Sequence, residues 1–340
     1  MKSHSLGFSC TTIDTTAKAL EHNLSSWLSS GYGPARVALD RKTKLGTNFE
    51  NDKEFILFTD QPKSDHERLC SWDSYTRKNI SYAHLAKEGV DAIFETDDDN
   101  YIYTEKFEEA VSSSYSLFKS CSSIDLFDTS NVFAQIYKVD HNIWARGYPL
   151  PWIEDGDNGA ILEGEAASAG VVQFLVDGNP DVDAIYRLIF GPDVDIPATN
   201  LKEPNLVFGR YHPFNSQATL WPRESFPLMY LPTNCDFRMT DIWRGYIAQH
   251  ILYHQNRGVV FAPSIVRQDR NPHKIYSDFY GEHEGYKKTP ELLNCLTDIH
   301  LEAGEPYGES LFRVYSELIG VGLFAQNELT LLSAFLESLE

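Results

Sequence analysis

Three consecutive aspartates, Asp97, Asp98 and Asp99, follow closely on the apolar segment at residues 92–94. Like charges this close repel one another, and the end of a buried strand is a costly place to keep them ionised. A Mg²⁺ or Mn²⁺ ion would relieve both costs, because carboxylate and phosphate oxygens are its preferred ligands. Side chains alternate along a strand, so we expect Asp97 and Asp99 to share a face and bind the metal, with Asp98 opposite. The alternative for an isolated triplet is a solvated acidic turn.

Strands and helices alternate around this triplet. Apolar patterns predict strands at residues 6–13, 36–39, 55–59 and 91–94, with helices ending near Gly31 and spanning residues 75–87. This alternation predicts an α/β protein with a mostly parallel sheet. Ligands of such sheets bind beyond the carboxyl ends of the strands. Thr11, Asp60 and the aspartate triplet fall at these ends, which predicts a single nucleotide site.

Two further segments could contact the phosphates of a nucleotide. Arg77 and Lys78 open the helix at residues 75–87, where cationic side chains and free backbone N–H groups could bind a diphosphate together. Arg146 begins a Gly-aromatic-Pro turn, which suits bidentate contact with phosphate or sugar. The alternatives are a solvated basic turn at Arg77 and an ordinary structural turn at Arg146.

The segment at residues 236–246 combines several chemically active groups. Asp241, Trp243 and Arg244 offer a carboxylate, a flat ring and a cation within one turn of a predicted helix. Asp241 could act as general base on an acceptor hydroxyl, with Arg244 beside the bound donor; the alternative is that Asp241 serves only the helix dipole. The polar loop at residues 267–273 could close over phosphates, with His273 as an additional metal ligand.

Composition narrows the class of protein. The 340 residues include 29 Lys and Arg against 49 Asp and Glu, a formal net charge of −20. That charge opposes binding to nucleic acid or an anionic membrane, and it repels nucleotide phosphates unless a metal intervenes. Five cysteines without a CxxC pair predict reduced thiols. With no signal peptide and no apolar run of about 18 residues, we expect a cytoplasmic protein without a membrane span.

The C-terminal part is predicted to be helical from about residue 290 onward. Leu311, Val314 and Leu318, and later Leu332 and Phe335, recur at helical spacing. Such a face must be buried against the same chain or against a second copy. We expect a main domain at residues 1–285 and a helical extension at residues 286–340 that forms a homodimer.

Taken in order, four segments resemble one family, the STELLO-type glycosyltransferases. They are YTRKNISYAHLAKEGVDAIFETDDDN, RGYP, TDIWRGY and RQDRNPH. The chain is also distantly similar to the plant reversibly glycosylated polypeptides, which are UDP-arabinopyranose mutases. The resemblance implies a GT-A fold, which is a Rossmann-like nucleotide-sugar-binding domain. It also implies a DxD motif at Asp97 and Asp99 that holds Mn²⁺ or Mg²⁺, with Asp98 between them.

The resemblance further implies a metal-dependent glycosyltransferase that moves a sugar from a nucleotide-sugar donor, a UDP-sugar, to a hydroxyl acceptor. By position, Asp60 would lie near the base and Asp241 on the acceptor side. Arg146 matches the arginine that the mutases glycosylate, so one alternative is a mutase that glycosylates itself at Arg146. Another is a non-catalytic scaffold of a glycan-synthesis complex that assembles through its C-terminal helices.

Overall fold

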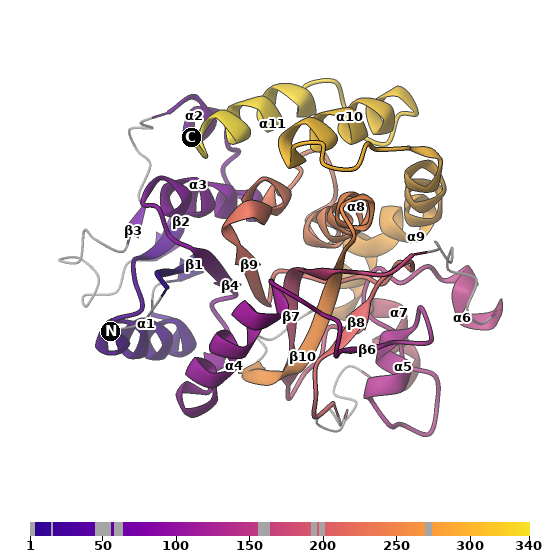
Figure 1. Cartoon of the computed structure of the whole chain (residues 1–340), viewed down its shortest axis with the longest axis horizontal. Coiled ribbons are helices and arrows are strands. Elements are labelled where there is room, and N and C mark those ends of the chain that lie inside the picture. Colours follow the sequence, from indigo (N-terminus) through magenta and orange to yellow (C-terminus); the bar gives the residue numbers. More distant parts are fainter. Residues whose placement is uncertain are drawn as a thin grey trace.

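A computed structural model describes residues 4–14, 16–44, 56–57, 64–155, 164–191, 196, 201–268 and 274–340. Asp60 and His273, both predicted site residues, lie outside the described residues. A mixed ten-stranded sheet runs through the molecule with helices on both faces (Figure 1). The predicted α/β class with a C-terminal helical extension is confirmed.

The first part of the chain forms the parallel portion of the sheet. The strands β1, β2, β3 and β4 pair in the order β3-β2-β1-β4, all parallel. They span Leu6–Asp14, Ala35–Lys44, Ile56–Leu57 and Ala92–Thr96. The intervening helices are α1 (Lys18–Ser30), α2 (Asp65–Leu69), the 3₁₀ turn η1 (Tyr75–Arg77) and α3 (Lys78–Lys87). Helix α1 ends where sequence predicts, because Gly31 takes a left-handed conformation with φ of 66°.

The sheet continues with strands from the middle of the chain. Strand β9 (Ala218–Pro222) lies between β4 and β7 (Ser168–Asp177) and is antiparallel to both. Strands β4 and β7 therefore point the same way, and their carboxyl ends share one edge with the start of β9. Beyond β7 lie β10 (Arg257–Gln268), β8 (Asn205–Val207) and β6 (Asp125–Leu126), and β5 (Asn100–Ile102) pairs with the end of β10.

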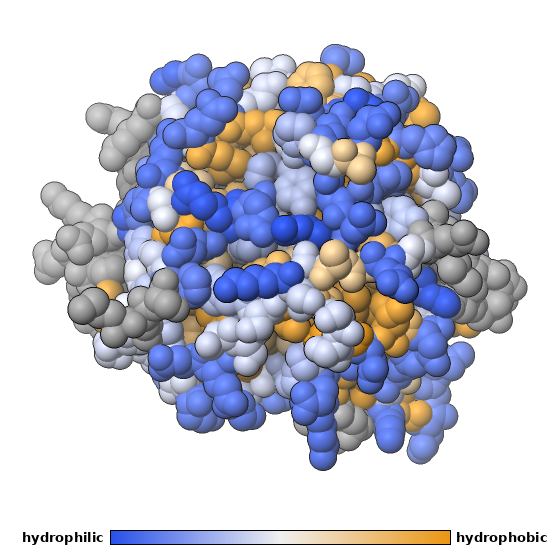
Figure 2. All heavy atoms as spheres, viewed as in Figure 1, coloured by the Kyte–Doolittle hydropathy of each residue, from blue (hydrophilic) through white to orange (hydrophobic). Residues whose placement is uncertain are grey.

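Two hydrophobic cores lie on opposite faces of the sheet. Helices α1 and α4 (Thr104–Leu117) cover one face around Phe94 and Trp27. The other face carries a larger core around Trp221 that includes α3 and α8 (Thr240–His254). The remaining short helices of this middle part are α5 (Val132–Ile136), α6 (Pro151–Asp155), α7 (Ala184–Phe190) and the 3₁₀ helix η2 (Arg223–Met229). Figure 2 shows that hydrophilic residues cover much of the visible surface.

The C-terminal helices belong to the larger core. Helices α9 (Ile275–Asp298), α10 (Tyr307–Gly320) and α11 (Glu328–Glu337) pack on α7, α8, η2 and α2 (Figure 1). Leu318, Leu332 and Phe335 are fully buried there. The apolar face that suggested a homodimer is thus covered by the chain itself, and that reason for expecting a dimer is wrong. The predicted boundary at residue 285 falls inside α9, which spans it as one helix.

A buried carboxylate fastens the extension to the loop that precedes α8. Glu328 accepts hydrogen bonds from the Tyr230 hydroxyl at 2.6 Å and from the backbone N–H groups of Thr233 and Asn234, both at 2.8 Å. Its side chain is fully buried. The extension therefore supports the segment that leads into Asp241. Among the described residues, no helix combines the length and the apolar character needed to cross a membrane.

Candidate functional site

A cavity of about 450 Å³ opens where the strand ends meet. Its wall follows the order of the strands across the sheet. Asp40 comes from β2, Thr11 from β1, the aspartate triplet follows β4, Asn215 and Gln217 precede β9, and Asp181 follows β7. Of the residues predicted for the site, Thr11, Asp97, Asp98, Asp99, Arg146 and Asp241 line this cavity. The structure thus brings together six predicted residues from four separate segments of the chain.

The aspartate triplet forms a turn after β4 and does not continue the strand. The strand ends at Thr96, and all three aspartates line the cavity. The expectation that Asp98 would point away from Asp97 and Asp99 is therefore wrong, because the alternation of a strand does not extend into a turn. All three residues line the same cavity.

The three carboxylates differ in their partners. Asp97 accepts hydrogen bonds from the Tyr75 hydroxyl at 2.7 Å and from the Lys78 ammonium at 3.2 Å. Asp98 accepts from the Thr12 hydroxyl. Asp99 accepts from the Gln268 amide at 3.0 Å through Oδ2, whereas its Oδ1 is buried without a hydrogen-bond partner.

The charge on this turn is only partly compensated. Burial, and next the charge of Asp97, raise the pKa of Asp99 to about 7. Burial likewise raises the pKa of Asp98. A divalent cation fits this donor set, because it would fill the unbonded Oδ1 of Asp99 and favour ionised carboxylates. Within the described residues, no three His, Cys, Asp or Glu side chains form a metal-binding group. A cation here would therefore take further ligands from substrate phosphates or water.

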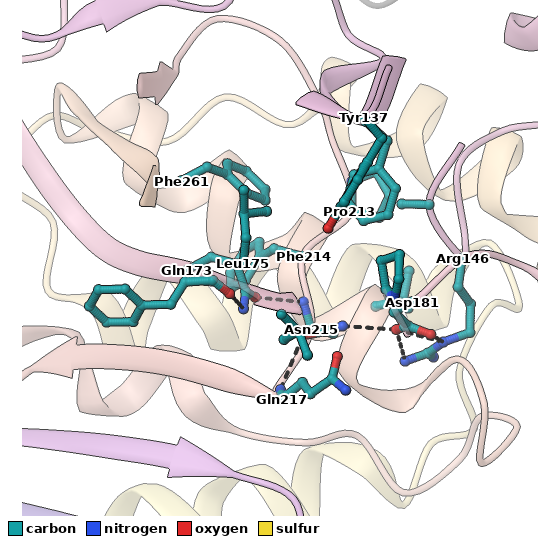
Figure 3. A pocket seen from close by; sticks show the side chains of 16 residues that line it. Tyr137, Arg146, Gln173, Leu175, Asp181, Pro213, Phe214, Asn215, Gln217 and Phe261 are labelled. Carbon is teal, nitrogen blue, oxygen red and sulfur yellow. Dashed lines mark hydrogen bonds and ion pairs between the residues drawn. The ribbon is translucent and has the colours of Figure 1, made fainter. Parts of the chain in front are cut away.

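Arg146 lines the same cavity and lies between two carboxylates, of which Figure 3 shows Asp181. Its Nε and Nη2 donate to Asp181, at 3.0 and 2.7 Å, and its Nη1 and Nη2 donate to Asp241, at 3.0 and 3.1 Å. Nη1 also donates to the backbone carbonyl of Arg238. All five N–H groups of the guanidinium are therefore engaged. Although burial opposes ionisation, Arg146 holds the pKa of the Asp181 carboxyl below its ordinary value.

Amide side chains hold the cluster of Arg146, Asp181 and Asp241 in place through further hydrogen bonds. Asn215 donates to Asp181 at 2.8 Å, and its own backbone N–H donates to the Gln173 side chain at 3.0 Å. A small chamber of about 30 Å³ lies among Gln173, Asn215 and the apolar rings around them (Figure 3). The Arg146 cluster is thus part of a packed polar layer.

Three predicted binding residues do not face the cavity. Arg77 is buried with its Nε donating to the Leu39 carbonyl at 2.6 Å and its guanidinium 3.9 Å from the centre of the Trp72 ring. Lys78 is buried beneath Asp97. Arg244 is buried in an ion pair with Glu95 at 2.9 Å. Direct phosphate binding by Arg77, Lys78 or Arg244 does not fit these positions, because each cation compensates a carboxylate or a carbonyl inside the protein.

Trp243 is also removed from the cavity. Its ring is buried, and its N–H donates to Thr289 of α9 at 3.1 Å. The flat ring that the sequence offered beside Asp241 is therefore not exposed to a ligand in this cavity. The exposed ring near the cavity is that of Phe237, 62% exposed and 5.8 Å from Tyr75 between ring centres.

Sequence reasoning missed several cavity residues. Asp40 has a buried Oδ1 without a hydrogen-bond partner, and Asp181 carries half of the Arg146 cluster. Asp181 could have been found, because it follows the buried strand β7 as the triplet follows β4. Tyr75, Asn215 and Gln217 carry no such signal in the sequence.

The described lining of the cavity is strongly acidic. It contains seven carboxylates and three basic side chains, Lys42, Arg146 and Arg238. Lys42 pairs with Asp73 at 2.9 Å, and Arg238 pairs with the buried Glu282 at 2.7 Å. Each of these basic groups already has an acidic partner. The described lining therefore offers an anionic ligand no cation that lacks an acidic partner.

Comparison with known proteins agrees with the resemblance seen in the sequence. A family described as STELLO glycosyltransferases matches residues 238–340. Over this part, the chain is similar to the STELLO glycosyltransferases. "Probable glycosyltransferase STELLO2" of Arabidopsis thaliana is 25% identical over 61% of this chain and 29% of its own length. "Probable glycosyltransferase STELLO1" of the same plant is 24% identical over 58% of this chain and 27% of its own length.

These matches therefore span less than a third of the length of the two plant STELLO proteins. Among solved structures, TarS of S. aureus in complex with UDP-GlcNAc is similar, with 10% identity and a TM-score of 0.45. That similarity covers 99% of this chain and 82% of the TarS chain. The family match includes Asp241 and the C-terminal helices, so this extension has a counterpart in STELLO proteins.

Proposed function

We propose that this STELLO-related chain is a metal-dependent glycosyltransferase of GT-A type that uses a nucleotide-sugar donor. The observation that carries the proposal is the acidic turn after β4, where Asp98 and Asp99 face the cavity and have no cationic partner among the described residues. The donor would be a UDP-sugar and the acceptor a hydroxyl group. Mn²⁺ or Mg²⁺ would be held by Asp99 and Asp98 together with the donor diphosphate.

The unbonded groups of the cavity fit the parts of such a donor. The buried Oδ1 of Asp40 requires a hydrogen-bond donor, which the N–H of a uracil base supplies and a phosphate does not. Asp40 would therefore hold the base beside Thr11, in the role that the resemblance gave to Asp60. The diphosphate would lie at the triplet, which follows the adjacent strand β4.

The chain's own residues would position the reaction. The metal would act as a Lewis acid on the leaving diphosphate. Lys78 and Tyr75 donate hydrogen bonds to Asp97 and thereby orient the turn. The Lys78 ammonium would not contact the phosphates. The acceptor oxygen would form a bond to the anomeric carbon as the bond to the diphosphate breaks, and its proton would pass to a carboxylate or to water.

Asp241 is better suited to orient than to deprotonate. Both of its oxygens accept hydrogen bonds from Arg146, and Oδ2 also accepts one from the Ser216 N–H at 3.4 Å, so its lone pairs are largely occupied. We propose that Asp241 and Arg146 together shape the far wall of the cavity. This arrangement gives no support to the mutase alternative, because the Arg146 nitrogens are all engaged and a guanidinium held by two carboxylates is a poor acceptor.

The proposal is tested by the release of UDP from UDP-sugars in the presence of Mn²⁺, with water as acceptor. We expect release that is abolished by EDTA and by Asp99→Asn, and retained by Asp298→Asn, a matched change at an exposed aspartate of α9. Release that continues in EDTA would contradict the metal. A folded Asp99→Asn protein that releases UDP like the original chain would contradict the metal assignment at this turn. No release of UDP by the folded original chain would favour the scaffold alternative.

A further inference from the structure

The far end of the cavity restricts the kind of sugar that the donor can carry. We infer that the donor sugar is neutral, and that Asp181 and Asp241 reject a sugar that bears a carboxylate. The inference rests on the proposed function, because it assumes that a nucleotide sugar occupies this cavity.

The strand order gives the direction in which the donor lies. Asp40 on β2 and Thr11 on β1 offer the base site, and the triplet follows β4. Asn215 precedes β9, and Asp181 follows β7. Four strand spacings separate β2 from β7, a span of about 19 Å. An extended nucleoside diphosphate sugar has a comparable length. A base at β2 and a diphosphate at β4 therefore direct the sugar toward Asn215, Asp181 and Asp241.

The cation at this end is not available to an anionic sugar. Arg146 is the group that would otherwise pair with a sugar carboxylate, since guanidinium and carboxylate match in a bidentate way. Its five N–H groups already donate to Asp181, Asp241 and the Arg238 carbonyl. Asp181 and Asp241 are largely buried, and both carboxylates would repel a negatively charged sugar bound beside them.

The other basic side chains in the described lining are also committed. Arg238 donates to Glu282 from Nε at 3.1 Å and from Nη2 at 2.7 Å. Lys42 pairs with Asp73. The metal proposed at the triplet would be shared with the diphosphate. The described wall thus provides carboxylates and amides around the sugar. Arg146 and Arg238 are held in buried or part-buried pairs, and Lys42, on β2 at the base end, pairs with Asp73 at the surface.

This surface suits a neutral sugar. Sugar hydroxyls donate hydrogen bonds, and ionised carboxylates accept them. The Asp181 side chain keeps 17% of its surface exposed, although Arg146 and Asn215 hold it in place. It can therefore accept a hydroxyl without moving. Asn215 and Gln217 add amide groups that carry no charge.

Calorimetric titration of the full chain with UDP, UDP-glucose and UDP-glucuronate in Mn²⁺ tests the inference. UDP-glucose carries a hydroxymethyl group at the position where UDP-glucuronate carries a carboxylate. We expect UDP-glucose to bind at least about tenfold more tightly than UDP-glucuronate, since like charges brought together oppose binding. Equal or tighter binding of UDP-glucuronate would overturn the inference and leave the proposed function standing. Failure of UDP itself to bind in Mn²⁺ would overturn both.

A charge-removing variant makes the test specific to this wall. Asp241→Asn removes one carboxylate and frees part of the Arg146 charge for a ligand. We expect it to shift the ratio of the two affinities toward UDP-glucuronate by about tenfold. Asp181→Asn should shift the ratio in the same direction, and it provides a second measurement if the first variant does not fold. Asp298→Asn, which removes the same charge at a distance, should leave the ratio unchanged. An unchanged ratio in a folded Asp241→Asn or Asp181→Asn protein would overturn the assignment of the rejection to this pair.

Discussion

The two walls of the cavity handle negative charge in opposite ways. At the turn after β4, Asp98 and Asp99 have hydroxyl and amide partners, and burial raises the pKa of both. At the other wall, Asp181 and Asp241 share Arg146, which engages both through all of its N–H groups. Buried charges that are compensated inside the protein hold its shape, whereas buried carboxylates left uncompensated either take up a proton or bind a cation. The first wall is therefore expected to bind the cation, and the second to keep the site in shape.

The largest expected effect is on folding, at the compensated wall. Arg146→Ala leaves two buried carboxylates without their cation and should lower the free energy of unfolding by about 3–5 kcal/mol. Arg36→Ala is the matched control, because it breaks the more exposed pair with Glu88 and should cost at most about 1 kcal/mol. Denaturant unfolding measures both. A loss at Arg146 no greater than that of the control would mean that the wall does not depend on its ion pairs.

The opposite pattern is expected at the uncompensated wall. Asp99→Asn should weaken UDP binding in Mn²⁺ by about 100-fold, because the ion loses a ligand. It should not lower the free energy of unfolding, since it removes a poorly compensated buried charge. Calorimetry with UDP and Mn²⁺, alongside denaturant unfolding, separates the two effects. A marked loss of stability with normal UDP binding would reverse the comparison.

Asp97 combines features of both walls and should give an intermediate result. It faces the cavity, yet it accepts a hydrogen bond from the buried ammonium of Lys78. Asp97→Asn should lower the free energy of unfolding by about 1–2 kcal/mol, because Lys78 loses its ionic partner. UDP binding in Mn²⁺ should weaken less than in Asp99→Asn. If Asp97→Asn proves the more damaging of the two for UDP binding, Asp97 is the principal ligand.

The smallest effect concerns pH. The pKa of Asp99 is raised to about 7 from an ordinary 3.8, so the ligand-free folded chain binds a proton that the unfolded chain has lost. Its stability should therefore fall as the pH rises from about 4 to 7 and then level off. Mn²⁺ competes with that proton, so its affinity should drop about fivefold between pH 7 and pH 6 and change little above pH 8. Asp99→Asn should abolish both dependences.

Sequence predicted the parts of this site that depend on local order. The strand before the triplet, the helix that carries Asp241 and the alternation of strands and helices all follow from periodicity. The positions of the strand ends then predicted that Thr11 and the triplet would meet. The C-terminal helices were predicted as helices, because their apolar residues recur at helical spacing.

The rest depends on contacts between distant parts of the chain. Arg146 meets partners 35 and 95 residues away, so neither Asp181 nor the pairing with Asp241 could be read from its neighbours. Arg77 and Arg244 look like phosphate ligands in sequence, and only burial against Leu39 and Glu95 shows otherwise. The periodicity of the C-terminal residues shows that an apolar face must be buried, but it does not show whether the same chain or a second copy covers it. The expected homodimer was the wrong choice between these two.

Anomalous diffraction from crystals grown with Mn²⁺ and UDP tests the central claim most directly. We predict an anomalous peak in coordination contact with the carboxylate of Asp99 and with the diphosphate, and the Arg146 cluster unchanged at the opposite wall. UDP bound without a metal peak, or a peak away from residues 97–99, would contradict the account.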